Sequence, residues 1–148
     1  ILKDGKARSI GVSNFTIRHL EELFAMTEVV PAVNQIEFTP YNYQKELQEY
    51  CEGKGIKIEA WSPLTRGLKL GDPKLVEVAE RYGKSPAQIL IRWGLQHGVI
   101  VLPKSARRER IIENMQVFDF NISEKDMEKL DGFNENFRTS GWDPNSFQ

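Results

Sequence analysis

The sequence predicts an α/β protein in which a parallel β-sheet is covered by helices. Two observations lead to this fold class. Four short segments rich in β-branched residues recur along the chain, and a segment with helical spacing of apolar residues follows each of them. The expected strands are also too short and too apolar to face water, as is typical of parallel sheets. They cover residues 8–12, 32–37, 57–61 and 99–102.

The helical segments are marked by apolar spacing and by capping residues. Leu20 lies on the apolar face of the first one, Ser85 followed by Pro86 is a typical helix start, and Ser123 precedes an acidic first turn. We expect helices around Leu20, over residues 44–54, 74–82, 85–97 and about 106–115, and from Ser123 onward, with a polar loop or tail over residues 134–148.

Strand–helix units of this kind build two architectures, an open doubly wound sheet and a (β/α)8 barrel. A complete barrel needs roughly 250 residues, so the 148 residues here supply about half of one. An open sheet of four strands would be small but is not excluded. The spacing alone leaves both architectures open.

Composition excludes several functional classes. The chain is 40% hydrophobic, enough for one buried core, and its net charge of −1 argues against nucleic acid or an anionic membrane as a partner. No apolar run is long enough to span a bilayer. A lone cysteine, Cys51, excludes a disulfide framework and fits a reducing compartment, so we expect a cytoplasmic protein. The chain begins at Ile1 without a methionine or a signal peptide, and we expect the natural protein to begin earlier.

Polar side chains stand at the carboxyl ends of the first three expected strands, where both architectures bind ligands. Ser13 and Asn14 follow the first strand, Gln35 lies in the second, and Trp61 ends the third. Each also has a structural interpretation: a helix N-cap for Ser13 and Asn14, a buried amide for Gln35, and a core or rim aromatic for Trp61.

The segment KSARRERIIEN, residues 104–114, follows the fourth expected strand and carries four positive and two negative side chains. Cations at the start of a helix oppose its dipole, so helix stability does not explain them, whereas a bound anion would. The alternative is a solvated basic face. Lys104 and Ser105 lie just beyond the strand, and Arg107, Arg108 and Arg110 crowd the first turns of the next helix. The sequence has no glycine-rich dinucleotide or P-loop motif, so if a nucleotide binds, side chains must hold its phosphate.

Several runs of sequence resemble the aldo-keto reductases, in the family's order and over nearly the whole chain. They are GKARSIGVSNF (5–15), VNQIEFTPY (33–41), WSPL (61–64), GKSPAQILIRW (83–93) and LPKSARRERIIEN (102–114). The resemblance implies a (β/α)8 TIM barrel, of which residues 1–148 would be the C-terminal half, about strands five to eight. Residues 134–148 would then be a tail over the barrel mouth, with Trp142 and Phe147 either lining the pocket or packing on its rim.

The resemblance also implies NADPH as the cofactor, and a role for each candidate residue. Ser13, Asn14 and Gln35 would contact the nicotinamide carboxamide, and Trp61 would stack on its ring, at a position where the family often has tyrosine. The other implied contacts are Ser62 and Leu64 with the pyrophosphate, Lys104, Ser105 and Arg110 with the adenosine 2′-phosphate, and Glu113 and Asn114 with the adenine.

The implied function is the NADPH-dependent reduction of aldehydes or ketones by a full-length reductase. The family's catalytic Asp, Tyr, Lys and His come from the first half of the barrel, and no residue here matches them, so we assign none to catalysis and expect this chain alone to be inactive. No metal is expected. The expected partners are a small carbonyl substrate and either the missing half-barrel or a second copy. The alternatives are a regulatory barrel that binds NADPH without turnover and an inactive scaffold.

Overall fold

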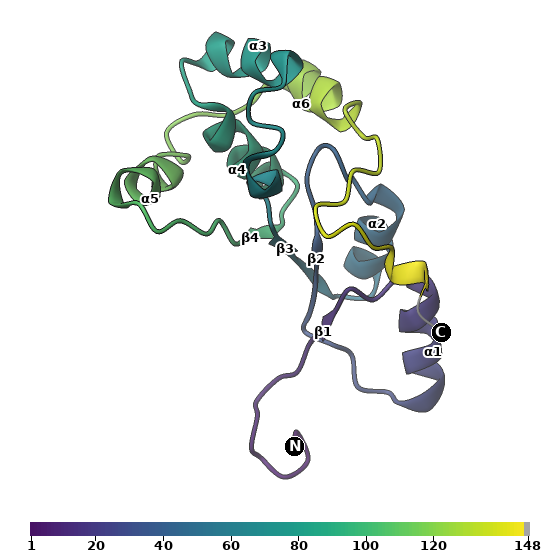
Figure 1. The fold of residues 1–148 in the computed structure, drawn as a ribbon. Helices are drawn as coiled ribbons and strands as arrows, with labels where there is room; N and C mark the ends of the chain where they lie inside the picture. Colours follow the sequence, from purple (N-terminus) through teal and green to yellow (C-terminus); the bar gives the residue numbers. More distant parts are fainter. Residues whose placement is uncertain (147–148) are drawn as a thin grey trace.

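A computed structural model describes residues 1–146 and shows one four-stranded parallel sheet. The strands lie in the order β1-β2-β3-β4, which is their order in the sequence (Figure 1). Their bounds are Val12–Ser13, Val33–Glu37, Lys57–Trp61 and Ile100–Val101.

Six α-helices and two short 3-10 helices connect and follow these strands. The α-helices are α1 (Ile17–Met26), α2 (Lys45–Gly53), α3 (Pro73–Tyr82), α4 (Pro86–Gln96), α5 (Arg108–Met115) and α6 (Glu124–Asp131); the 3-10 helices are η1 (Thr65–Gly67) and η2 (Pro144–Ser146). Among residues 1–146, no helix combines the length and the apolar character that crossing a membrane requires.

The strand order decides between the two architectures that the sequence left open. Connections between parallel strands are right-handed, so strands that follow one another in the same direction across a sheet place all their helices on one face. A doubly wound sheet instead reverses its strand order at a switch point. No reversal occurs among the four described strands, which excludes the doubly wound alternative. Consecutive parallel βα units are the building plan of the (β/α)8 barrel.

The two faces of the sheet differ sharply in burial. Ile36 pairs in register with Ala60 and both are buried against the helices, together with Trp93 of α4, which is 0% exposed. On the other face Gln35 pairs with Glu59, and Glu59 with Ile100, whose side chain is 42% exposed. The core therefore lies only between the sheet and its helices.

The predicted elements all occur, with corrections at three boundaries. The first strand begins at Val12 rather than at residue 8, because an edge strand has only one neighbour to pair with. Thr16 caps α1, so the N-cap interpretation of Ser13 and Asn14 was wrong. Helix α5 begins at Arg108 rather than at residue 106, since the Ser105 hydroxyl accepts a hydrogen bond from the backbone of residue 107 and forms a turn there.

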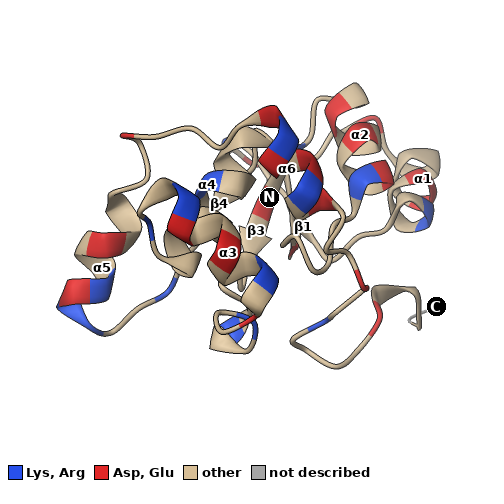
Figure 2. Cartoon of the chain, turned by 90° about the horizontal axis from the view of Figure 1, so that it is seen from above, with Lys and Arg blue, Asp and Glu red and all other residues tan. Residues whose placement is uncertain are grey.

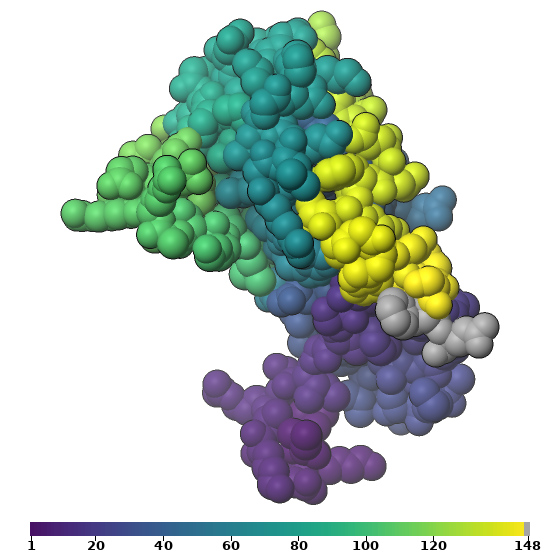
Figure 3. All heavy atoms as spheres, viewed as in Figure 1, coloured from purple at the N-terminus to yellow at the C-terminus, as the bar shows by residue number. Residues whose placement is uncertain are grey.

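The chain after α6 returns across the molecule toward β1 and α1. The backbone N–H groups of Glu135 and Phe137 both donate to the Tyr41 carbonyl, at 3.2 and 2.9 Å. Figure 3 shows the end of this tail, in yellow, lying against the purple N-terminal part of the chain, while the first residues project away from the body. Phe147, one of the two predicted tail aromatics, lies outside the described residues.

Candidate cofactor site

The ends of β1 and β3 are joined by side chains that the sequence singled out. The Trp61 indole N–H donates to Asn14 Oδ1 at 2.9 Å, and Asn14 Nδ2 donates to Ser13 Oγ at 3.2 Å. Ser13 Oγ in turn donates to the Gln35 carbonyl at 3.0 Å. Asn14 has a left-handed backbone with φ of 58°, a conformation that costs free energy and is common at functional sites. Ser13, Asn14 and Trp61 thus form one connected group.

Asn34 holds this group in place, and sequence reasoning missed it. It is 0% exposed, and its side chain contacts the backbone of Phe15 twice, donating to the carbonyl at 2.8 Å and accepting from the N–H at 3.3 Å. Its only sequence signal is an amide at a position of β2 that faces the apolar core.

The Gln35 side chain lies beside this group but is bonded elsewhere. Its amide nitrogen donates to the Glu59 carboxylate, which lies next to it in the sheet register. The alternative interpretation of Gln35, a buried amide satisfied by backbone, was therefore wrong, because the side chain is half-buried and its partner is a carboxylate.

The loop after β3 has an unusual backbone. Ser62, Thr65 and Arg66 all have positive φ, between 49° and 51°. The Thr65 side chain is buried and its hydroxyl accepts from the backbone N–H of Lys69 at 3.1 Å, which ties the loop to itself. Non-glycine residues persist in this conformation only where the surrounding structure enforces it.

A large cleft opens between this loop and α5. Its volume is about 630 Å³, within the range of small-molecule and cofactor sites. Seven of the eleven predicted cofactor residues line it: Ser62, Leu64, Lys104, Ser105, Arg110, Glu113 and Asn114. The other four lie outside this cleft: Ser13 and Asn14 at the end of β1, Trp61 at the end of β3, and Gln35 in the middle of β2.

Three cations and one carboxylate, Glu113, line the cleft. Lys104 and Arg110 were predicted, whereas Arg66 was missed because it stands alone in the sequence. Within residues 1–146, none of the three forms an ion pair with a carboxylate. Figure 2 shows basic residues in the loop that leads into α5 and at the start of that helix. Unpaired cations around a cavity fit an anionic ligand such as a phosphate.

Three tyrosines and the single cysteine lie in the core or pack against it. Burial raises the pKa of Tyr41, and it raises that of Tyr43 and Tyr50 to about 12. Burial also raises the pKa of Cys51, the opposite of a reactive thiol. These shifts give no support to a proton-transfer role for these residues. Over residues 1–146 there is no group of three or more side chains suited to a metal ion.

Comparison with known proteins agrees with this geometry. A sequence model of the Aldo/keto reductase family matches residues 1–135. The chain belongs to this family. In sequence it is similar to a glyoxal reductase of Bacillus subtilis (strain 168), with 53% identity over 138 residues that cover 93% of this chain and 50% of the relative. It also resembles a 9,11-endoperoxide prostaglandin H2 reductase of Trypanosoma cruzi (strain CL Brener), with 45% identity, covering 99% of this chain and 53% of that protein.

Solved structures show the same fold. A crystal structure of a Gox0644 mutant in complex with NADPH superposes with a TM-score of 0.91 at 42% identity, and covers 99% of this chain and 54% of that one. The apo form of Gox0644 gives a TM-score of 0.90. The chain thus spans about half the length of the curated relatives and solved structures that it matches.

Proposed function

We propose that this chain is the C-terminal, cofactor-binding half of an NADPH-dependent aldo-keto reductase that reduces aldehydes or ketones to alcohols. The observation that carries the proposal is the cleft beyond β4, whose lysine and two arginines have no carboxylate partner among the described residues. A 2′-phosphate supplies the missing negative charge, which the 2′-hydroxyl of NADH does not.

The residues present fit this cofactor in two regions. Lys104, Ser105 and Arg110 would hold the 2′-phosphate, and Glu113 and Asn114 the adenine. Ser62 and Leu64, also in the cleft, would flank the pyrophosphate. Ser13, Asn14, Gln35 and Trp61 would hold the nicotinamide, and the hydrogen bond already present between Asn14 and Trp61 orients both side chains in advance. When bound, NADPH supplies the hydride for the carbonyl carbon.

The proton for the carbonyl oxygen must come from outside this chain in our proposal. No tyrosine here occupies the position that the family uses, and the edge strands β1 and β4 each have one open side in the described sheet. We therefore propose that the rest of the barrel completes the enzyme, that this half alone does not turn over carbonyls, and that the protein is cytoplasmic. The glyoxal reductase relative supports small aldehydes as a substrate class.

The test is to titrate the intact protein, that is, the full-length reductase, with NADPH and with NADH. Quenching of tryptophan fluorescence reports the binding of each dinucleotide. Lys104→Ala and Arg110→Ala should each weaken NADPH binding by roughly 10- to 100-fold, as expected for the loss of a charged hydrogen bond, and should change NADH binding little. Arg108→Ala is the matched control, because Arg108 lies in the same basic segment but does not line the cleft.

Equal losses for both dinucleotides, or for the control, would contradict a 2′-phosphate site. Binding without turnover of any carbonyl compound by the intact protein would favour the regulatory alternative instead.

A further inference from the structure

Glu37, the last residue of β2, is a buried carboxylate outside the predicted cofactor contacts. Its side chain is 3% exposed, and Oε1 accepts hydrogen bonds from the Thr139 backbone N–H at 2.8 Å and from the Thr139 hydroxyl. The two residues are 102 positions apart in the sequence. Burial of a carboxylate costs free energy unless donors compensate it, so this pair of bonds is the main compensation that the fold provides.

No cation shares this carboxylate. Among residues 1–146, no lysine or arginine forms an ion pair with Glu37, and its second oxygen, Oε2, is buried without a hydrogen-bond partner. The backbone carbonyl of Glu37 is used separately, since it accepts from the side chains of Asn42 and Gln44 at 3.2 and 2.9 Å. The backbone therefore holds the turn after β2, while the carboxylate is directed to the tail.

The tail beyond Thr139 reaches the strand ends of the candidate site. Ser140, Trp142 and Pro144 line a cavity of about 10 Å³ together with Asn14, Trp61 and Glu37 itself. A space of that size holds about one water molecule, so the tail is packed closely on these residues. The bonds at Thr139 come immediately before this segment and fix where it starts.

We propose that Glu37 is a positioning residue that anchors the C-terminal tail through Thr139 and thereby places Ser140 and Trp142 as a wall beside Asn14 and Trp61. The anchor follows from the geometry alone. Its consequence for catalysis rests on the proposed function: the wall borders the nicotinamide end of the site, so the anchor sets how a carbonyl substrate is held there.

Trypsin provides a direct test, because the bond after Arg138 adjoins the anchored N–H of Thr139. In the intact protein, Glu37→Leu removes the acceptor, and cleavage at Arg138 should become about tenfold faster because the tail opens more often. Thr139→Val keeps the shape and the backbone N–H but removes the hydroxyl donor, and should accelerate cleavage about threefold. Ser146→Ala, at an exposed residue farther along the same tail, is the matched control and should leave the rate unchanged.

Cleavage within α4, after Arg92, reports general unfolding in the same digest. An unchanged rate at Arg138 in both Glu37→Leu and Thr139→Val would overturn the proposal, and so would equal acceleration at Arg138 and Arg92. Thr139→Val keeps the test valid if Glu37→Leu fails to fold.

Kinetic measurements on the full-length enzyme distinguish an effect of the anchor on substrate binding from an effect on cofactor binding. Thr139→Val should raise KM for the carbonyl substrate about threefold while the Kd for NADPH stays within about twofold, as expected for a contact on the substrate side. A change in the NADPH Kd with KM unaltered would contradict the assigned wall. If NADPH does not bind at all, the proposed function fails, but the digest still decides the anchor.

Discussion

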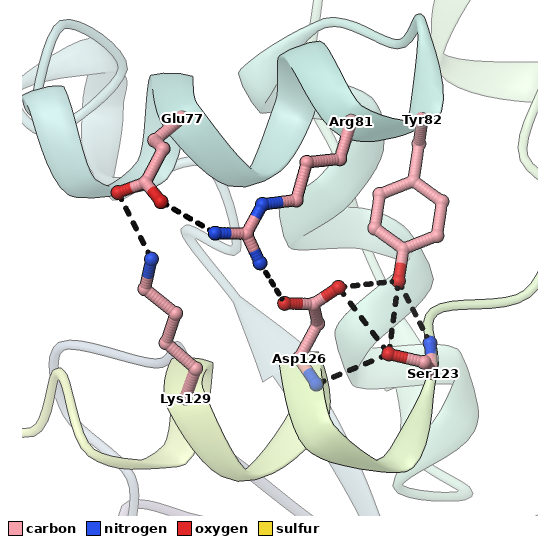
Figure 4. A network of polar contacts seen from close by, with 6 residues as sticks. All are labelled: Glu77, Arg81, Tyr82, Ser123, Asp126 and Lys129. Atoms are coloured by element: carbon pink, nitrogen blue, oxygen red, sulfur yellow. Dashed lines mark hydrogen bonds and ion pairs between the residues drawn. The ribbon is translucent and has the colours of Figure 1, made fainter.

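Two groups of cations in this protein have opposite surroundings. Arg81 on α3 donates to Asp126 at 2.7 Å, and Lys129 on α6 lies 3.0 Å from Glu77 (Figure 4). Lys104 and Arg110, beside the cleft, have no such partner within the described residues. The first group joins two helices, whereas the second lines a cavity.

The difference separates charges that the fold pairs from charges that we propose for binding. Tyr82 adds a hydrogen bond to Asp126 at 2.7 Å, so the carboxylate between α3 and α6 is satisfied by the protein itself. In our proposal, the cations at the cleft find their partner in the 2′-phosphate of the cofactor. Removing the first group should cost stability, and removing the second should cost binding.

The largest expected effect is on cofactor affinity. The double change Lys104→Ala with Arg110→Ala removes two unpaired cations and should raise the Kd for NADPH by about 100-fold or more. Thermal unfolding should be almost unaffected, within about 0.5 kcal/mol, because neither side chain has an internal partner to lose. Fluorescence titration and a melting curve on the same sample measure both. A clear loss of stability would show that these cations are structural after all.

For Asp126, whose side chain is 10% exposed, we expect a loss of stability without a loss of cofactor affinity. Asp126→Asn removes a negative charge that accepts from Arg81 and Tyr82, and should lower the free energy of unfolding by about 1–3 kcal/mol. The Kd for NADPH should not change. Asp4→Asn, on the projecting N-terminal segment, is the control and should melt as the unaltered protein does. An altered Kd would mean that the α3–α6 contact shapes the cleft.

Because of the polar contacts between α3 and α6, we expect the protein to lose stability in acid. Burial acts to raise the pKa of Asp126, but hydrogen bonds from Tyr82 and Ser123 and the charge of Arg81 outweigh it, and the pKa is lowered from 3.8. Hydrogen bonds from Lys129 and Arg81 likewise lower the pKa of Glu77 from 4.5. Because the folded state binds these protons less tightly than the unfolded state, the stabilisation is complete above these ordinary values.

The stabilisation is then lost as the pH falls through the lower folded values. Urea unfolding between pH 6 and about pH 3 should show this decline, and Asp126→Asn should make it shallower. An identical decline in the variant would show that other carboxylates dominate.

The smallest expected effect is that of salt. Charges at an exposed cleft are screened by ions, so raising the ionic strength from about 0.05 to about 0.5 M should weaken NADPH binding a few-fold more than NADH binding. Titrations of both dinucleotides at each ionic strength measure the difference. Parallel losses would indicate that the pyrophosphate, common to both, carries the electrostatic attraction.

Local sequence signals predicted most of the fold. Ser85 and Ser123 cap their helices as expected, with hydroxyls that accept from the backbone N–H groups of Gln88 and Asp126. Capping and apolar spacing depend on residues three or four positions apart, so they are visible in one sequence. The choice between the open sheet and the barrel could not be predicted in this way, because it depends on the spatial order of the strands.

Residues that line the cleft were predictable where several charged residues lie close together in one segment of the sequence. Lys104 and Arg110 lie six positions apart and stand out together. Arg66 reaches the same cleft from another loop, and the contact of Glu37 with Thr139 joins residues 102 positions apart. Such contacts form only when distant segments pack together, so no local sequence pattern predicts them.

The one-sided winding of the sheet has a consequence for association. Within the described chain, β1 and β4 each have a neighbour on one side only, and both run in the same direction. Each edge therefore presents unpaired backbone groups to a further parallel strand, and for self-association we propose a head-to-tail contact of β4 of one copy with β1 of the next. In that case a rotation that closes after two copies gives an eight-stranded ring, and a rotation that never closes gives an open fibre.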